Sequence, residues 1–168
     1  MTIQSGCSFV APFAYAKGVA TVGIYFLIYS VTGVVVRVLG RRLLDRVGLA
    51  RVLVPALAIL AIGMALVAGT GHRGVLNLSA LIGGFGHGYL YPSLSALVIA
   101  RTDTVAMGRS SSIYTSLYDA GTFMGPYLLG VVGEFFGYGP VFIVSGAFAL
   151  VAAGYFVVVE PQSLRSSD

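Results

Sequence analysis

Charged residues are scarce in this chain. Only 10% of its 168 residues are Asp, Glu, Lys or Arg, whereas soluble domains carry roughly 25%. Hydrophobic residues make up 57% of the chain, and the mean hydropathy is +0.92. A chain of this length cannot hide so much apolar surface from water. The composition therefore excludes an ordinary soluble domain and predicts an all-α integral membrane protein.

Metal-binding and catalytic patterns are also missing. Cys7 is the single cysteine, which excludes an internal disulfide and a cysteine metal site. His72 and His87 have no further ligands for zinc, so we expect neither a metal nor a cofactor. Residues 69–74 fit G-x-G-x-x-G, but they follow an apolar helix rather than a strand. Residues 110–112 lack the context of a nucleophile elbow, and we expect no enzyme.

The N-terminus shows no secretory signal, because Lys17 follows the first apolar stretch instead of preceding it. That stretch, residues 7–16, has about half of the ~20 residues that a spanning helix needs. We interpret residues 1–16 as the end of a truncated transmembrane helix. Residues 17–159 are then a bundle of helices, and residues 160–168 are a polar tail.

Five segments within the bundle are long and apolar enough to span a bilayer. The third segment is the longest and contains several glycines and Pro92, so it should tilt or bend. Short hydrophilic breaks separate the segments. The predicted spans are 19–39, 52–69, 75–100, 113–133 and 141–159, and the breaks are 40–51, 70–74, 101–112 and 134–140.

Arginines cluster in the first break, where five of them and one aspartate lie between residues 37 and 51. Basic residues concentrate on the cytoplasmic side of membrane proteins. Placing this break inside puts eight basic residues on the cytoplasmic face and only Lys17 and Arg73 outside. The polar tail is then cytoplasmic. Because the bases lie at helix ends without interleaved aromatics, the pI of 9.4 does not predict nucleic-acid binding.

Three stretches resemble the C-terminal half of the major facilitator superfamily. The break contains Asp45-Arg46-x-Gly48, which is similar to the family's loop between the second and third helices of each half. Arg41 stands where the family has its first glycine, and Leu49-Ala50 replace the usual basic pair. Residues 83–92 resemble the glycine-rich tenth helix. Residues 118–130, followed by Phe-Gly-Tyr at 136–138, are similar to the eleventh helix and its loop.

The resemblance implies the C-terminal bundle of a twelve-helix secondary carrier, truncated at its N-terminus. Its partners would be the lipid bilayer of the cell inner membrane, the missing N-terminal half, a small-molecule substrate and, as a candidate, a coupling proton. Alternating access around a midplane site would be the mechanism. The rival hypothesis is a non-transporting multi-pass protein, such as an accessory subunit or an inactive truncation. Family members carry chemically diverse substrates, so the likeness names none.

Five polar positions are candidates for transport or gating. The resemblance implies that the loop with Asp45, Arg46 and Gly48 helps hold helices together on the cytoplasmic side, with Asp45 and Arg46 as a conformational latch; the alternative is a loop that serves topology alone. Asp119 is a carboxylate inside a predicted span, where charge is costly. It either titrates a proton or gates the carrier, or it is a structural partner for a cytoplasmic-end arginine such as Arg37 or for backbone amides.

Aromatic and histidine side chains are candidates for lining a cavity. Tyr25 and Tyr29 recur at helical spacing, as do His87 and Tyr91, which places each pair on one helix face. Such faces turn toward a wet cavity or toward a neighbouring helix. His87 binds substrate, carries protons or serves as a neutral hydrogen-bonding group. For Tyr89 and Tyr91 the resemblance implies a cavity wall.

Small residues in the fourth predicted span indicate close helix packing. Gly121 and Gly125 form a small-xxx-small pair, and Pro126 and Gly130 follow on the same segment.

Overall fold

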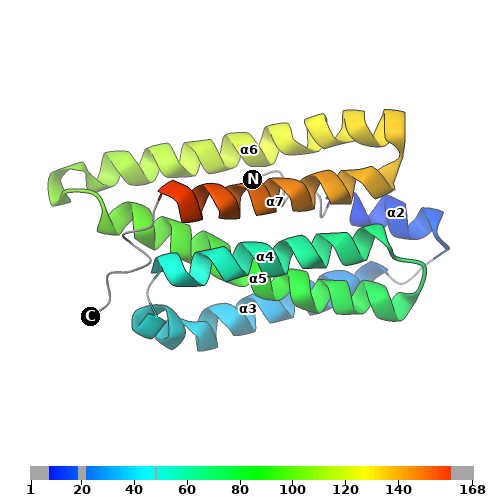
Figure 1. Ribbon diagram of the computed structural model, residues 1–168, viewed down its shortest axis with the longest axis horizontal. Helices are drawn as coiled ribbons and strands as arrows, with labels where there is room; N and C mark the ends of the chain where they lie inside the picture. The colour runs from blue at the N-terminus through cyan, green and yellow to red at the C-terminus, as the bar shows by residue number, and fades with distance from the viewer. Residues whose placement is uncertain (1–7, 19–21, 48, 160–168) are drawn as a thin grey trace.

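The computed structural model describes residues 8–18, 22–47 and 49–159, with the side chains of 41–50 and 159 left out. Within these ranges the regular structure is helical, and no strand occurs. Long helices lie side by side along one axis (Figure 1). They are α2 (Val10–Ala16), α3 (Val22–Val47), α4 (Leu49–Ala68), α5 (Arg73–Ala100), α6 (Met107–Phe136) and α7 (Tyr138–Val159), with a 3-10 turn at Thr104–Ala106 before α6.

Three stretches of the described helices are long and apolar enough to cross a membrane: Val22–Gly40, Arg51–Ala68 and Tyr138–Val158. α5 and α6 have 28 and 30 residues, which exceeds the ~20 needed for a span. Their lower hydropathy comes from glycines and polar residues on their faces. The fold is thus all-helical as predicted, while five spans and part of a sixth remain a prediction.

Two of the predicted hydrophilic breaks are largely helical, which corrects the sequence interpretation. α3 continues through the arginine-rich break to Val47, and α4 begins at Leu49. Arginine and leucine favour helices, and residues 41–47 contain neither glycine nor proline. α6 likewise runs to Phe136 and α7 begins at Tyr138, separated only by Gly137 with φ +82°. Hydropathy locates where apolar residues give way to polar ones, but a helix can continue past that point until its backbone turns.

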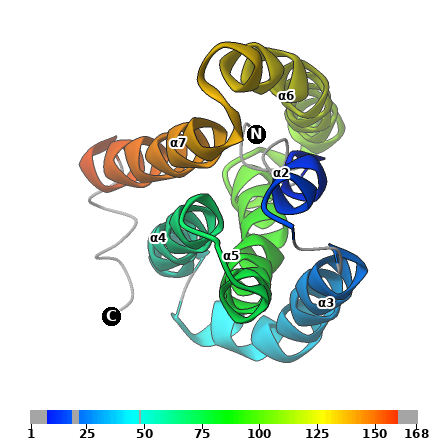
Figure 2. The same cartoon turned by 90° about the vertical axis from the view of Figure 1, so that its right-hand side faces the viewer.

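Glycines bring α5 into backbone contact with α3 and α4. A Cβ added at Gly84 would lie 2.6 Å from the Tyr29 carbonyl oxygen on α3, and one added at Gly86 would lie 2.7 Å from the Ala56 carbonyl oxygen on α4. α5 consequently runs between these two helices, as the view along the bundle shows (Figure 2). It remains one uninterrupted helix across its glycines and Pro92. The glycine-rich stretch therefore serves close packing.

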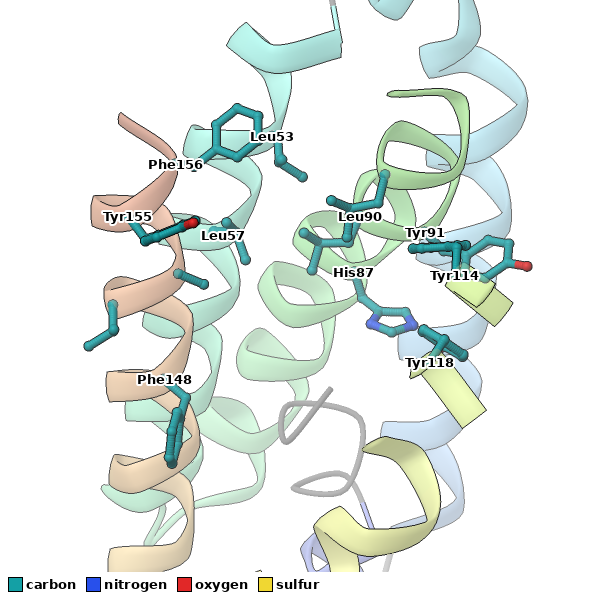
Figure 3. A pocket seen from close by; sticks show the side chains of 13 residues that line it. Leu53, Leu57, His87, Leu90, Tyr91, Tyr114, Tyr118, Phe148, Tyr155 and Phe156 are labelled. Carbon is teal, nitrogen blue, oxygen red and sulfur yellow. The ribbon is translucent and has the colours of Figure 1, made fainter. Parts of the chain in front are cut away.

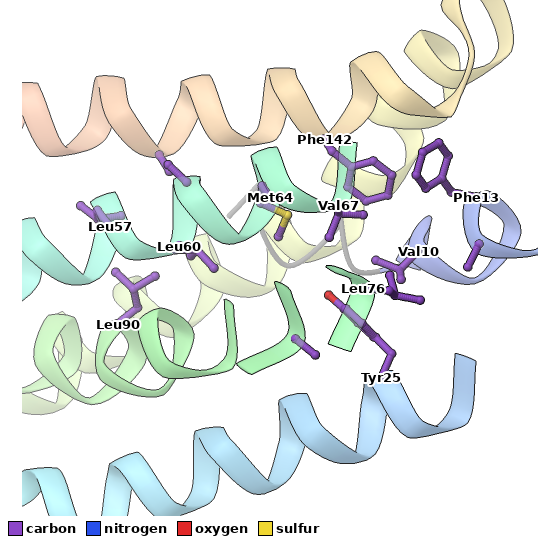
Figure 4. Packing of buried hydrophobic residues seen from close by; sticks show 14 of the residues in the cluster. Val10, Phe13, Tyr25, Leu57, Leu60, Met64, Val67, Leu76, Leu90 and Phe142 are labelled. Carbon is purple, nitrogen blue, oxygen red and sulfur yellow. The ribbon is translucent and has the colours of Figure 1, made fainter. Parts of the chain in front are cut away.

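The main core cluster joins five of the six helices. Tyr25 of α3, Leu60 and Met64 of α4 and Phe142 of α7 are almost fully buried in it. Phe13 of α2 packs on Phe142 with ring centroids 5.2 Å apart (Figure 4). Of the described residues in this cluster, α6 contributes none. α6 therefore covers the bundle from outside, where its spacing from α5 and α7 is not dictated by shared core side chains.

The small residues of α6 lie where it approaches its neighbours. Gly125 is buried, and Gly121, Pro126 and Gly130 are half-buried. A Cβ added at Gly130 would lie 3.7 Å from the ring of Phe9. A role of these residues in close helix packing stays a prediction.

The glycine contact makes a testable prediction for stability. Gly86→Ala should lower the free energy of unfolding by about 1–3 kcal/mol, because its methyl group would collide with the backbone of α4. Gly154→Ala is the matched control: nothing lies within 4 Å of a Cβ there, so alanine should be neutral or stabilise the helix by up to ~1 kcal/mol. Circular dichroism in mixed micelles against increasing denaturing detergent measures both. Equal stability of the two variants would contradict the close approach.

Candidate ligand cavity

A cavity of about 520 Å³ lies between α4, α5, α6 and α7. One side is apolar: Leu53 and Leu57 come from α4, and Phe148 and Phe156 come from α7 (Figure 3). None of the thirteen lining residues is Asp, Glu, Lys or Arg. Because α6 takes no part in the core cluster, the space between it and α7 is not filled by core side chains. The volume falls within the range of small-molecule sites.

The opposite side of the cavity is a cluster of aromatic side chains. Tyr91 of α5 faces Tyr118 of α6 edge to face, with ring centroids 5.2 Å apart. Tyr114 lies one turn before Tyr118 on α6, and its ring centroid is 6.0 Å from that of Tyr91. This arrangement follows from i, i+4 spacing on α6, which places both tyrosines on the face toward α5. We call these three residues the tyrosine cluster.

His87 stands beside the tyrosine cluster. Gly83, Gly84 and Gly88 occupy the face of α5 toward α3, and Gly86 occupies the face toward α4. His87 is left on the remaining face, and its ring points toward Tyr118 (Figure 3).

The Nδ1 atom of His87 is buried and has no hydrogen-bond partner among the described residues. A buried polar atom without a partner costs about 1–3 kcal/mol, so the site is poised to gain from a ligand that supplies one.

The predicted cavity residues divide between two environments. His87 and Tyr91 line the cavity, and both had been selected from their helical spacing. Tyr25 is 1% exposed within the core, and Tyr29 packs between Tyr25 and His87, with ring centroids 6.1 and 5.9 Å away. Neither is among the lining residues.

Tyr89 also lies away from the cavity. It is buried in a second cluster with Val36, Val52 and Ala56. A Cβ at Gly40 would overlap its ring. Two residues turn a helix by about 200°, so Tyr89 points away from the face of His87 and Tyr91.

The predicted gating residues lie outside the cavity wall. Arg37 is exposed on α3, and Asp119 is exposed on α6, next to Tyr118 in sequence. The backbone at Asp45 and Arg46 is helical but their side chains are not described, and Gly48 lies outside the described residues. Their roles remain predictions.

Sequence reasoning missed Tyr114, Tyr118 and the apolar wall on α7. The signal for the two tyrosines was present, since they stand four residues apart on one helix face. The residue singled out from the sequence is instead Asp119, which follows Tyr118 and therefore lies about 100° further around the helix. The α7 wall has no such signal, because nearly every residue of that helix is apolar.

Long apolar helices packed through glycines around an internal cavity define a multi-pass membrane protein. The family comparison is specific: a profile of the Major Facilitator Superfamily matches residues 4–168. The chain belongs to this superfamily. The match confirms the family indicated by the Asp45-Arg46-x-Gly48 motif and the glycine-rich helix.

Two curated relatives share parts of this sequence. An uncharacterised MFS-type transporter, STM4428, of Salmonella typhimurium is 28% identical over 132 residues, covering 78% of this chain and 34% of the relative. The multidrug resistance protein MdtG of a Rahnella species is 35% identical over 114 residues, covering 66% of this chain and 27% of the relative. The chain thus spans about a third or less of these proteins. No solved structure matches it.

The unpartnered imidazole makes a second testable prediction. His87→Leu should leave the free energy of unfolding unchanged or raise it by up to about 2 kcal/mol, because an unsatisfied buried atom is removed. The matched control is His72→Leu. His72 Nδ1 accepts a hydrogen bond from Gly74 N, 3.3 Å away, at the start of α5, so its loss should cost about 0.5–2 kcal/mol. Strong destabilisation by His87→Leu would show instead that the imidazole holds the fold together.

Proposed function

We propose that the chain is part of a secondary carrier that moves a small molecule across the inner membrane. The observation that carries the proposal is the cavity between α4, α5, α6 and α7, whose largely apolar wall contains the tyrosine cluster and a histidine with a buried Nδ1 that has no hydrogen-bond partner among the described residues. Polar groups are costly within a membrane protein unless they serve a pathway or a partner. Membership of the superfamily and the transporter relatives support the same function.

Alternating access is the mechanism that suits such a bundle. In this proposal the chain supplies the C-terminal half, and a second half completes the substrate path. The long α3, which ends in the arginine-rich segment, would move as one rigid helix at the cytoplasmic face. Arg37, Asp45 and Arg46 would exchange partners there between the inward-open and outward-open states. No catalytic chemistry is required of any residue, because gradient-driven movement replaces bond making.

The rival function is a multi-pass membrane protein that does not transport, such as an accessory subunit. It explains the apolar helices equally well, but it gives no reason for a cavity lined by an imidazole whose buried Nδ1 has no hydrogen-bond partner among the described residues. The cavity therefore favours the carrier.

Transport by reconstituted protein tests the proposal. Proteoliposomes would hold either the 168-residue chain alone or a longer polypeptide in which a family N-terminal half precedes it. Uptake of a panel of radiolabelled small molecules is then measured with and without a pH gradient. We expect uptake by the longer polypeptide for at least one compound. Uptake no greater than in empty liposomes across the panel would favour the accessory-subunit hypothesis.

Asp119 offers a test of proton coupling in the same assay. Asp119→Asn in the longer polypeptide should lower the transport rate by about tenfold, as expected when about 1.4 kcal/mol is lost from the limiting step. Glu134→Gln is the control, because Glu134 is an exposed carboxylate on the same helix. Unchanged transport and unchanged pH dependence in Asp119→Asn would remove any coupling role for this residue.

The arginine distribution predicts the orientation of the bundle, with the C-terminus in the cytoplasm. A fluorescent protein fused after residue 168 should fold and fluoresce, while alkaline phosphatase fused there should be inactive. The same reporters inserted after Gly71, between α4 and α5, should give the reverse pattern. Active phosphatase at the C-terminus would invert the assigned topology.

A further inference from the structure

The cavity wall carries no full charge. Its lining is aliphatic and aromatic apart from one imidazole and the tyrosine hydroxyls. A charged ligand group placed there would lose part of its hydration and find no counter-ion in the wall itself, which is unfavourable. The charged side chains that act electrostatically on His87 and Tyr118 are Arg37 and Asp119, and both lie outside the wall. The nearest carboxylate in sequence, Asp119, lies on the exposed side of α6. The lining therefore selects for an uncharged ligand.

The polar part of such a ligand has a defined place. Two lining residues have a buried polar atom without a hydrogen-bond partner among the described residues, His87 Nδ1 and Tyr114 Oη. The Tyr114 hydroxyl points away from the cavity, whereas the His87 ring faces it (Figure 3). A neutral imidazole offers one donor and one acceptor, so a hydroxyl or an amide can satisfy it whichever nitrogen carries the proton. Across the cavity, the hydroxyl of Tyr155 points from α7 toward Leu57 (Figure 3). Polar groups thus lie at isolated points on a largely apolar surface.

The rest of the wall determines the size and polarity of the apolar part of the ligand. Tyr91 and Tyr118 already pack edge to face at 5.2 Å, and a third ring can join such a cluster by stacking or by an edge contact. Leu53, Leu57 and Phe148 provide an apolar surface opposite. A volume of about 520 Å³ accommodates a ring with a short alkyl chain.

We propose that this cavity binds an uncharged aromatic amphiphile, a ring bearing a hydroxyl or amide with an apolar extension, as the substrate class. The polar group bonds to His87, and the ring packs on the tyrosine cluster. That the ligand is a substrate rests on the proposed function, whereas its binding to the cavity does not. All four walls come from this one chain, so binding needs no second half.

Competitive photolabelling tests the inference on the 168-residue chain in lipid nanodiscs. The probe is 4-hexylphenol with a diazirine in its alkyl chain, and labelled positions are read by peptide mass spectrometry. Unlabelled 4-hexylphenol should block labelling of cavity residues on α5 and α7. The cation 4-hexylphenyltrimethylammonium and the anion 4-hexylbenzoate should each need at least about tenfold higher concentration, because their charges would be buried without a partner.

Three variants separate the cavity from the lipid-facing surface. His87→Leu should weaken competition by 4-hexylphenol about tenfold, the effect of one hydrogen bond. Ala152→Phe should also weaken it, by filling the cavity without altering its polar atoms. Tyr127→Phe is the matched control: this tyrosine of α6 is 77% exposed, so its loss should change nothing.

Three outcomes of the labelling experiment would overturn the inference. Equal competition by the cation would overturn the uncharged class, and labelling confined to exposed residues such as Tyr127 would show bilayer partitioning only. Competition by added phospholipid alone, with none by 4-hexylphenol, would make the occupant a bilayer lipid and also overturn the inference. Binding without transport would remove the proposed function and leave the site standing, whereas transport without binding would remove this site alone.

Discussion

The contact of α5 with both α3 and α4 through glycines is the constraint on which the other features depend. Backbones that touch at Gly84 and Gly86 leave no room for side chains on two faces of α5. The larger residues of the same stretch must therefore point elsewhere. Tyr89 is buried against α3 and α4 near Gly40, and His87 and Tyr91 take the face toward α6. The cavity therefore lies on the face of α5 that carries large side chains instead of glycines.

The second determinant is the way α6 attaches. It joins α7 at a single residue, Gly137, whose φ of +82° suits glycine. Away from that joint its buried residues are Gly125 and Leu129, and its tyrosines Tyr114 and Tyr118 pack on Tyr91 of α5. Between α6 and α7 a space remains at the far end from the joint, and aromatic side chains line it. The cavity is a consequence of two helices that meet at one end only.

Composition and hydropathy were sufficient to predict helices and a membrane protein, and the resemblance of motifs such as Asp45-Arg46-x-Gly48 indicated the family, because apolar length and short motifs are local signals. Helix ends were harder to predict. Residues 41–47 are polar but favour helix, so the break read from hydropathy lies inside α3. For the site, i, i+4 spacing found His87 and Tyr91 but equally proposed Tyr25, which is a core residue. The i, i+4 spacing shows that residues share a helix face, but only the packing of the helices determines whether that face meets the core or a cavity.

The separation of core and cavity has a consequence for how this scaffold can diversify. Tyr114, Tyr118, Phe148 and Tyr155 line the cavity yet lie outside the core cluster that holds the helices together. Substitutions at Phe148 and Tyr155 would alter the cavity wall without removing contacts of the core cluster, whereas Tyr114 and Tyr118 also hold α6 against Tyr91 of α5. Natural selection on substitutions in the α7 part of the cavity wall would consequently act through function rather than through folding stability. Paralogues built on this arrangement would drift fastest along the inner face of α7, while the glycines of α5 stay fixed.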